Sequence, residues 1–386
     1  MKGFTYNDDD FQSAKPTGSL GDKIMYLAQI LVLVIFTFCT EYSTGVAPSP
    51  TSAEDTGNAA AVNLYPMFQD VNVMIFIGFG FLMTYIKAQG QSALAFTWIV
   101  SIWCIQWGIL SQAWFISLIK GQPLGKIPID LNSLINGLFG AATAMISYGA
   151  LLGKCSIQQL LFLTMFEMIF WGLNWAICLY SLKAVDMGGS IIIHVFGCYY
   201  GLAASWWFQP DRAAKSNNNS SNHNSEIIAL IGSIFLWLYW PSFNGATAAQ
   251  GDEQQRVICN TNLSIGAGCV AASLLSRIYY GKLEMTIVMN ATLAGGVAIG
   301  TASNLVSNPS TAMWIGFIAG SWSAFGFDKL NGYFADKINL QDTCGVNWLH
   351  GTPGIIGGLA SFVVLSSWEA DNGNFGATYN SLHNPQ

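Results

Sequence analysis

Long apolar segments follow one another along most of the chain, and they decide what it can fold into. An α-helix needs about 20 predominantly apolar residues to cross the hydrocarbon core of a bilayer. Only 9% of the residues are charged, whereas soluble domains carry about 25%. We therefore predict an all-α polytopic membrane protein that forms a single domain over residues 1–386. The predicted spans are eleven, at residues 24–40, 68–86, 92–118, 132–152, 157–180, 189–208, 226–247, 257–279, 285–305, 311–327 and 349–367.

The first apolar run follows a polar segment, residues 1–22, that contains three consecutive aspartates at positions 8–10. A secretory signal peptide is the alternative interpretation. However, the preceding segment is long and partly acidic, and the run of residues 24–40 exceeds the apolar region of a usual signal peptide. We expect an uncleaved first span, with residues 1–22 as a cytoplasmic tail.

The basic residues indicate the orientation in the membrane. If the N-terminus is cytoplasmic, eleven of the 15 Lys and Arg fall on the cytoplasmic side: Lys2, Lys15, Lys23, Lys87, Lys154, Arg212, Lys215, Arg277, Lys282, Lys329 and Lys337. Only Lys120, Lys126, Lys183 and Arg256 fall outside. This is the positive-inside bias of membrane proteins, and it leaves the polar tail, residues 368–386, outside. The net charge of −6 and the scattered basic residues offer no stripe for nucleic acid.

A low-complexity segment, residues 211–225, separates two halves of the chain and is predicted to be a cytoplasmic linker. It contains glycosylation sequons at Asn218 and Asn219, and a cytoplasmic location predicts that they carry no glycan. Two histidines, His223 in the linker and His383 in the C-terminal tail, are expected to be solvated.

The two halves show an internal similarity. The segment NGLFGA begins at Asn136, 58 positions before His194, and the similar NATLAG begins at Asn290, 60 positions before His350. Five predicted spans separate the equivalent elements, an odd number, so the two halves would have inverted topology. Inverted repeats place equivalent elements around a site near the middle of the membrane. This arrangement predicts that His194 and His350 face one another.

Small residues and cysteines point to packing. Glycines recur four residues apart, a spacing that lets transmembrane helices approach closely. These pairs are Gly149/Gly153, Gly197/Gly201, Gly296/Gly300, Gly316/Gly320 and Gly354/Gly358. The eight cysteines form no CxxC pair and sit mostly in apolar runs, so we read them as packing residues rather than metal or redox ligands.

His194 and His350 are the ionisable side chains that most need an explanation, because both lie inside apolar runs. Such groups usually face a bundle interior and pair with one another. Two neutral imidazoles can share a hydrogen bond and leave their other nitrogens for a small polar molecule. The alternatives are an interhelical hydrogen bond without a transport role, and bis-histidine ligation of a haem.

Three further residues are candidates for a pore or its structure. Asp186, at the outer end of the span of His194, is expected to cap a helix, to favour a cation at the mouth through its negative charge, or to do both, because a carboxylate bonded to amides still contributes its field. Phe243 follows Pro241, which we expect to interrupt its span, and is either a packing residue or a constriction. Glu167, in the middle of its span, is expected to make an interhelical hydrogen bond or to be protonated.

Five long motifs resemble those of one family. They are YPMFQDVNVMIFIGFGFLMT (65–84), DMGGSIIIHVFG (186–197), LYWPSFN (238–244), NATLAGG (290–296) and QDTCGVNWLHGTPGIIGG (341–358). Together they resemble the Rhesus (Rh) glycoprotein branch of the ammonium transporter family, over about residues 20–366.

The resemblance implies a homotrimer with a pore through each subunit that conducts ammonia, with carbon dioxide as a second candidate gas. It implies that His194 and His350 are twin pore histidines, that Phe139 and Phe243 stack as a gate above them, and that Asp186 lies beside the opening. Glu284 and Asp342 then fall at acidic positions near the cytoplasmic exit. The resemblance implies no cofactor, no metal and no enzymatic activity.

This chain departs from the family pattern at three places. Eleven spans are predicted where twelve are usual, which leaves either a truncated chain or an external C-terminus. Asn347-Trp348 stands where the family more often has His-Asn, so the exit is expected to differ. Trp175 stands at a vestibule position that is often acidic; it is read as a membrane-interface residue, or alternatively as a cation–π site for ammonium. A non-conducting structural or sensor subunit remains the alternative to a channel.

Overall fold

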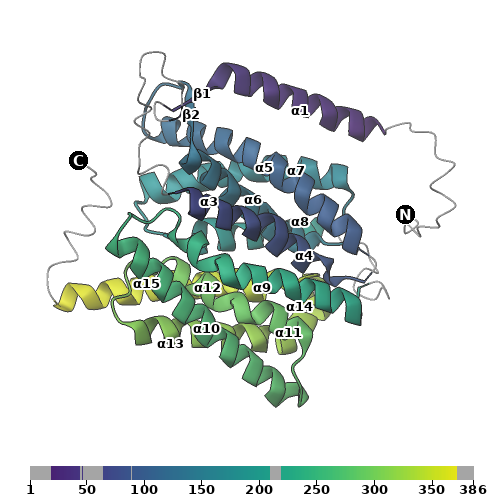
Figure 1. Ribbon diagram of the computed structural model, residues 1–386. Coiled ribbons are helices and arrows are strands. Elements are labelled where there is room, and N and C mark those ends of the chain that lie inside the picture. The colour runs from purple at the N-terminus through teal and green to yellow at the C-terminus, as the bar shows by residue number, and fades with distance from the viewer. Residues whose placement is uncertain (1–18, 44–45, 47–63, 88, 209–218, 372–386) are drawn as a thin grey trace.

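The computed structural model describes residues 19–43, 46, 64–87, 89–208 and 219–371 (Figure 1). The first half of the chain contains α1 (Leu20–Cys39), β1 (Thr40–Tyr42), α3 (Tyr65–Val73), α4 (Gly80–Leu82), α5 (Gly90–Ile119), β2 (Ile127–Ile129), α6 (Leu131–Leu151), α7 (Ile157–Ala176) and α8 (Phe196–Phe208). The second half contains α9 (His223–Gly245), α10 (Asp252–Tyr280), α11 (Met285–Asn290), α12 (Ala294–Gly300), α13 (Pro309–Phe325), α14 (Asn331–Ile338) and α15 (Thr352–Asp371). Shorter helical segments join several of these: η2 (Met74–Phe79), η3 (Met83–Tyr85), η4 (Ile177–Ser181), η5 (Ser190–Val195), η6 (Ala291–Leu293), η7 (Gly326–Leu330) and η8 (Asn347–Gly351).

The predicted all-α membrane architecture is confirmed. Within the described ranges, nine helices are long and apolar enough to cross a membrane. The two other predicted spans are the broken helix Met285–Gly300 and the 17-residue helix α13. The two halves lie side by side in Figure 1, the first in purple to teal and the second in green to yellow.

Helix ends differ from the predictions where local capping or packing decides them. α9 begins at His223, inside the predicted linker, because Asn222 caps it through the backbone amide of Ser225. His223 is exposed, as expected. Pro241 does not interrupt α9, which continues through it to Gly245. α15 continues to Asp371 and so includes the first four residues of the predicted tail, 368–371.

Several predictions fall on parts of the chain outside the described residues. They concern most of the N-terminal tail (1–18), the linker over 209–218 with Asn218, and the C-terminal segment 372–386 with His383.

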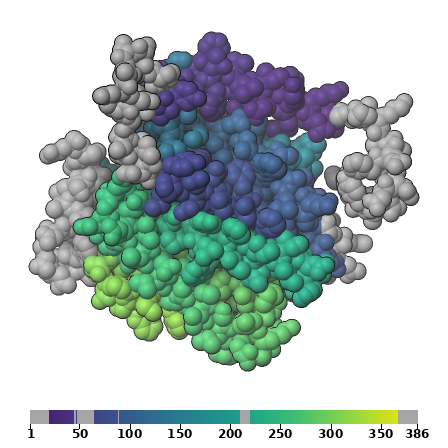
Figure 2. Space-filling view, viewed as in Figure 1, coloured from purple at the N-terminus to yellow at the C-terminus, as the bar shows by residue number. Residues whose placement is uncertain are grey.

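The short parallel strand pair formed by β1 and β2 was not predicted from the sequence. Thr40 lies opposite Ile127 and Tyr42 opposite Ile129. The pair ties the end of α1 to the loop before α6. α1 itself runs along one edge of the molecule, in purple in Figure 2. Only 6% of the residues in its apolar stretch are buried.

Helices come close together at several of the predicted glycine pairs, whereas Gly153 lies past the end of α6 with a φ of 77° and no backbone of the described residues close by. A Cβ atom on Gly316 would lie 1.8 Å from the carbonyl oxygen of Ser264, and one on Gly320 would lie 2.4 Å from that of Gly268. Both contacts join α13 to α10. A Cβ on Gly201 would lie 2.5 Å from Cα of Ser147, where α8 crosses α6. The small residues therefore set the helix spacing, as the motif predicts.

Candidate pore site

The same local structure precedes both candidate histidines, His194 and His350. In each half an aspartate precedes the histidine by eight residues, and a glycine follows the aspartate by three, giving Asp-x-x-Gly-x4-His at residues 186–194 and 342–350. Gly189 and Gly345 adopt positive φ values of 70° and 67°. Glycine adopts this conformation without the steric cost that a side chain adds. The chain then enters a short π-helical segment, η5 or η8, that carries the histidine.

Asp186 caps the first of these segments. Its Oδ2 accepts hydrogen bonds from the backbone amides of Ile191 and Ile192, at 3.0 and 2.8 Å, and its Oδ1 accepts one from the Thr301 hydroxyl at 2.6 Å. Burial raises the pKa of the Asp186 carboxyl, and these hydrogen bonds partly oppose the shift. The cap interpretation of Asp186 is therefore confirmed.

Asp342 caps the second segment in the same way. Its two carboxylate oxygens accept hydrogen bonds from the amides of Val346 and Asn347, both at 2.8 Å. Burial also raises the pKa of this carboxyl, against the effect of the amides. Phe139 of α6 lies beside the Asp186 segment, while Gly149, near the other end of α6, bonds the Asp342 segment. The two capped segments thus enter the bundle from opposite ends.

His194 and His350 meet where these segments converge. Their Nδ1 atoms are 3.0 Å apart, and the two rings are nearly parallel, at 4°. Both side chains are buried, and Nε2 of His194 has no hydrogen-bond partner. The rings are joined edge to edge, which leaves no space for a haem between them. The sequence-based expectation that the two histidines face one another is confirmed.

Aromatic rings surround His194. Trp240 stacks on it at 20°, with ring centroids 5.6 Å apart, and Phe243 lies 5.9 Å away. Phe139 contacts Phe243 with centroids 4.9 Å apart, but the planes meet at 70°, edge to face. The two buried rings therefore form the expected contact with one another, and its geometry is edge to face. Edge-to-face pairing is a favourable arrangement of two aromatic quadrupoles.

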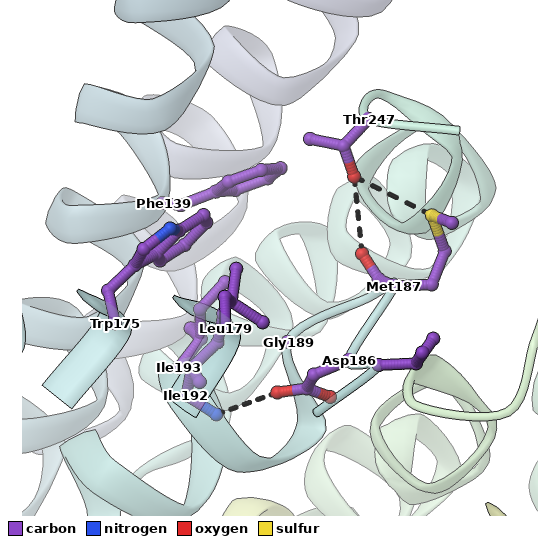
Figure 3. Close-up of a pocket in the computed structure, with 10 residues that line it drawn as sticks. Phe139, Trp175, Leu179, Asp186, Met187, Gly189, Ile192, Ile193 and Thr247 are labelled. Atoms are coloured by element: carbon purple, nitrogen blue, oxygen red, sulfur yellow. Dashed lines mark hydrogen bonds between the residues drawn. The ribbon is translucent and has the colours of Figure 1, made fainter. Parts of the chain in front are cut away.

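A cavity of about 170 Å³ lies beside Phe139 (Figure 3). Its lining includes Phe139, Trp175, Asp186, Ile192 and Thr247. It is mostly apolar, with the Asp186 carboxyl and the Thr247 hydroxyl among its polar groups.

Trp175 is not a membrane-interface residue. Its side chain is 8% exposed and stacks on Phe139 at 21°, with centroids 6.4 Å apart, as Figure 3 shows. A ring in the interfacial belt would instead face lipid and headgroups. α7 turns Trp175 inward because Gly172, one turn earlier, lets α7 approach the backbone of Ser111 and Gln112 in α5. The alternative interpretation, an aromatic face in the vestibule, agrees with this position.

The residues predicted near the cytoplasmic exit have structural partners. Glu284 caps α11 by accepting the Ile287 amide at 3.2 Å. Trp348 is buried and points away from His350: its indole donates to Asn331 at 3.1 Å and stacks on Phe334 at 5°. The unusual tryptophan therefore anchors α14 and does not line the exit.

Glu167 makes the expected interhelical hydrogen bond. Its Oε1 contacts the hydroxyl of Ser147 in α6, which also contacts the Gly197 carbonyl in α8 at 2.7 Å. The other oxygen, Oε2, is buried without a partner. Glu167 thus joins α7 to α6 and, through Ser147, to α8, and it is not among the residues that line the cavity.

Sequence reasoning missed Thr247, Trp240 and the repeated Asp-x-x-Gly-x4-His spacing. The repeated spacing could have been found in the sequence, because both segments contain it. A glycine at the same position in each segment indicates that the same turn occurs twice. Thr247 gave no signal, since a threonine after a span has no chemistry that distinguishes it.

Comparisons with known proteins agree with this geometry. Residues 30–384 match the family model described as Ammonium Transporter Family. The chain is 38% identical to the ammonium transporter Rh type C of Canis lupus familiaris over 354 residues, which cover 89% of this chain and 76% of that protein. It is 40% identical to the Rh type A protein of Bos taurus, with coverages of 89% and 81%.

A solved structure supports the same assignment. Rh50 of Nitrosomonas europaea, described as a member of the Rhesus protein family of channels, superposes with a TM-score of 0.73 at 30% identity, over 84% of this chain and 86% of that one. Mep2 of Candida albicans shares the fold, with a TM-score of 0.67 at 20% identity. The paired histidines, the capped segments that hold them and these matches over most of the chain lead to one conclusion: the chain belongs to the ammonium transporter family.

Proposed function

We propose that this protein conducts ammonia through a pore that passes His194 and His350. One observation carries the proposal: the two buried imidazoles bond through Nδ1 and leave Nε2 of His194 without a partner. A buried polar atom of this kind costs about 1–3 kcal/mol unless a partner reaches it. A small neutral molecule with both a lone pair and N–H groups supplies that partner.

The cavity near Asp186 suits the first step, recruitment of the ammonium ion. The face of Trp175 attracts a cation by about 0.5–2 kcal/mol, and the Asp186 carboxylate adds a negative field even though its oxygens accept hydrogen bonds. The cation then meets the contact of Phe139 with Phe243. Because an apolar constriction disfavours an ion far more than a neutral molecule, the ion gives its proton to water in the mouth and passes as ammonia.

Glu284 and Asp342 lie at the opposite mouth in this proposal and orient its helix ends. We assign that mouth to the cytoplasm, together with the N-terminus, because most of the basic residues fall on that side. The exposed apolar faces of the outer helices would then contact lipid and two further copies in a homotrimer. Carbon dioxide is the second gas to be tested.

Proteoliposomes test the proposal directly. An inward ammonium gradient should make the interior alkaline faster with the protein than without it. His194→Ala should reduce the protein-dependent rate at least tenfold, because the constriction loses its polar group. His223→Ala is the matched control, because this exposed histidine lies at the first residue of α9, while Phe243 lies near the other end of the same helix, so the rate should not change.

The outcomes separate the functions still open. No protein-dependent pH change would overturn conduction and favour a non-conducting subunit. Full conduction by His194→Ala would remove the twin-histidine role while leaving a channel. A protein-dependent acidification under a carbon dioxide gradient would add the second gas.

A further inference from the structure

A partly buried lysine, Lys154, binds three partners near Asp342. Lys154 follows the end of α6, and its ammonium donates to the Ala150 carbonyl and the Ser205 hydroxyl, both at 2.8 Å, and to the Gln341 carbonyl at 2.5 Å. Ser205 of α8 donates to the same Gln341 carbonyl at 2.6 Å. The lysine therefore joins α6, α8 and the segment that leads into η8. All three N–H donors of its ammonium group have an acceptor.

The segment after Gln341 lies against the end of α6. The Cys344 amide donates to the Gly149 carbonyl at 3.2 Å, and the Thr343 hydroxyl donates to the Ala150 carbonyl at 3.3 Å. A Cβ on Gly149 would lie 2.8 Å from Cγ1 of Val346, so the fit is close. We define residues 341–346 as the docking segment.

The docking segment determines where His350 lies. Gln341, which Lys154 binds, is followed directly by Asp342, whose carboxylate caps η8 through Val346 and Asn347. Lys154 also lies close enough to Asp342 for an attractive electrostatic interaction. From this chain of contacts we infer that Lys154 is a positioning residue for conduction: it fixes the docking segment, and through the Asp342 cap it holds His350 against His194.

The segment that contains Asp186 is held in place without a lysine. It docks on the end of α12, where the Gly188 amide donates to the Gly300 carbonyl at 2.9 Å and the neutral Thr301 hydroxyl bonds Asp186. The two copies of the repeat therefore differ in what fixes them. A change at Lys154 should disturb one histidine segment and leave the other in place.

Two substitutions in the full-length protein test this role, which rests on the proposed conduction of ammonia. Lys154→Met keeps the length of the side chain but removes its donors, and Lys154→Arg keeps charge and donors. Lys126→Met, in an exposed loop before β2, is the matched control. The readouts are the ammonium-driven pH change in proteoliposomes and hydrogen exchange of the amides in peptides that cover residues 186–194 and 341–350.

We expect Lys154→Met to slow conduction at least tenfold and to speed exchange in 341–350 alone, while Lys154→Arg stays within threefold of the wild type in both readouts. Lys126→Met should change neither. Equal increases in exchange in both peptides would assign Lys154 to general stability and overturn the inference, as would full conduction by Lys154→Met. If the wild type conducts no ammonia, the proposed function fails, and hydrogen exchange still decides whether Lys154 fixes the docking segment.

Discussion

Replacing Asp186 by alanine and by asparagine separates two roles of the side chain: capping η5 and attracting the ammonium ion by its negative charge. The carboxylate accepts three hydrogen bonds, two from backbone amides and one from Thr301. Alanine removes both acceptor oxygens and with them all three hydrogen bonds. Asparagine keeps its oxygen for the two amides and turns its NH₂ group toward Thr301, whose hydroxyl can rotate to accept. Asparagine therefore preserves the cap and removes only the charge.

The structure gives a magnitude for each change. A buried donor without an acceptor costs about 1–3 kcal/mol. The Thr301 hydroxyl can find another orientation, so the two amides left without an acceptor make Asp186→Ala destabilising by about 2–6 kcal/mol. Asp186→Asn should cost less than about 1 kcal/mol, because burial raises the pKa of the native carboxyl and the neutral amide avoids that desolvation.

Thermal unfolding in detergent and ammonium-driven flux in proteoliposomes are the assays. We expect Asp186→Ala to lower Tm strongly and to abolish flux, because η5 and His194 lose their anchor. Asp186→Asn should keep Tm near that of the wild type but need a higher ammonium concentration for half-maximal flux. A Tm of Asp186→Ala within one degree of the wild type would refute the cap argument. Unchanged concentration dependence in Asp186→Asn would refute the role of the charge.

Three further changes test other parts of the bundle. Gly326→Ala would place a Cβ 2.2 Å from the indole of Trp348, so we expect a loss of about 1–3 kcal/mol in stability and slower flux, measured by Tm and the proteoliposome assay. Ser147→Ala removes the hydrogen bond of buried Glu167 and should lower Tm, whereas the double variant with Glu167→Leu should regain part of the loss. Burial lowers the pKa of Lys154 to about 8 from 10.5, so the folded protein binds this proton less tightly than the unfolded chain. The stability of the wild type relative to Lys154→Met should therefore rise between pH 8 and 10.5, by at most about 3 kcal/mol, and stay constant below pH 8; a falling difference in Tm would contradict the sign.

The spans and the histidine pair were predictable from the sequence because membrane-spanning helices have few alternatives. Backbone groups in hydrocarbon must bond within the helix, so apolar length alone locates the helices. A histidine inside such a run needs a buried partner, and only His350 stood in surroundings like those of His194. The glycine pairs predicted close helix contacts for the same reason, since a missing side chain has few other uses in a membrane.

The inward position of Trp175 and the edge-to-face angle of Phe139 on Phe243 were not predictable. Trp is enriched at membrane interfaces, so residue type alone placed Trp175 on the lipid-facing side of α7. The close approach of Gly172 to α5 determines instead which side of α7 faces the bundle. Pro241 was misjudged because proline breaks helices in water, whereas neighbouring helices can satisfy the freed group in a bundle. Lys154 looked like one more cytoplasmic charge because its three acceptors come from segments far apart in the sequence.

The hydrogen bond between His194 and His350 links the tautomers of the two rings. One proton lies between the two Nδ1 atoms, so the ring that carries it has a bare Nε2, and the neutral ring that accepts it carries its own proton on Nε2. The pair therefore always offers one donor and one acceptor, and a proton exchange that reverses one ring must reverse the other. Ammonia can both donate and accept a hydrogen bond, so it can bond to both rings in either of the two tautomeric states. Carbon dioxide, which only accepts, can hydrogen-bond to just one of the two rings at a time.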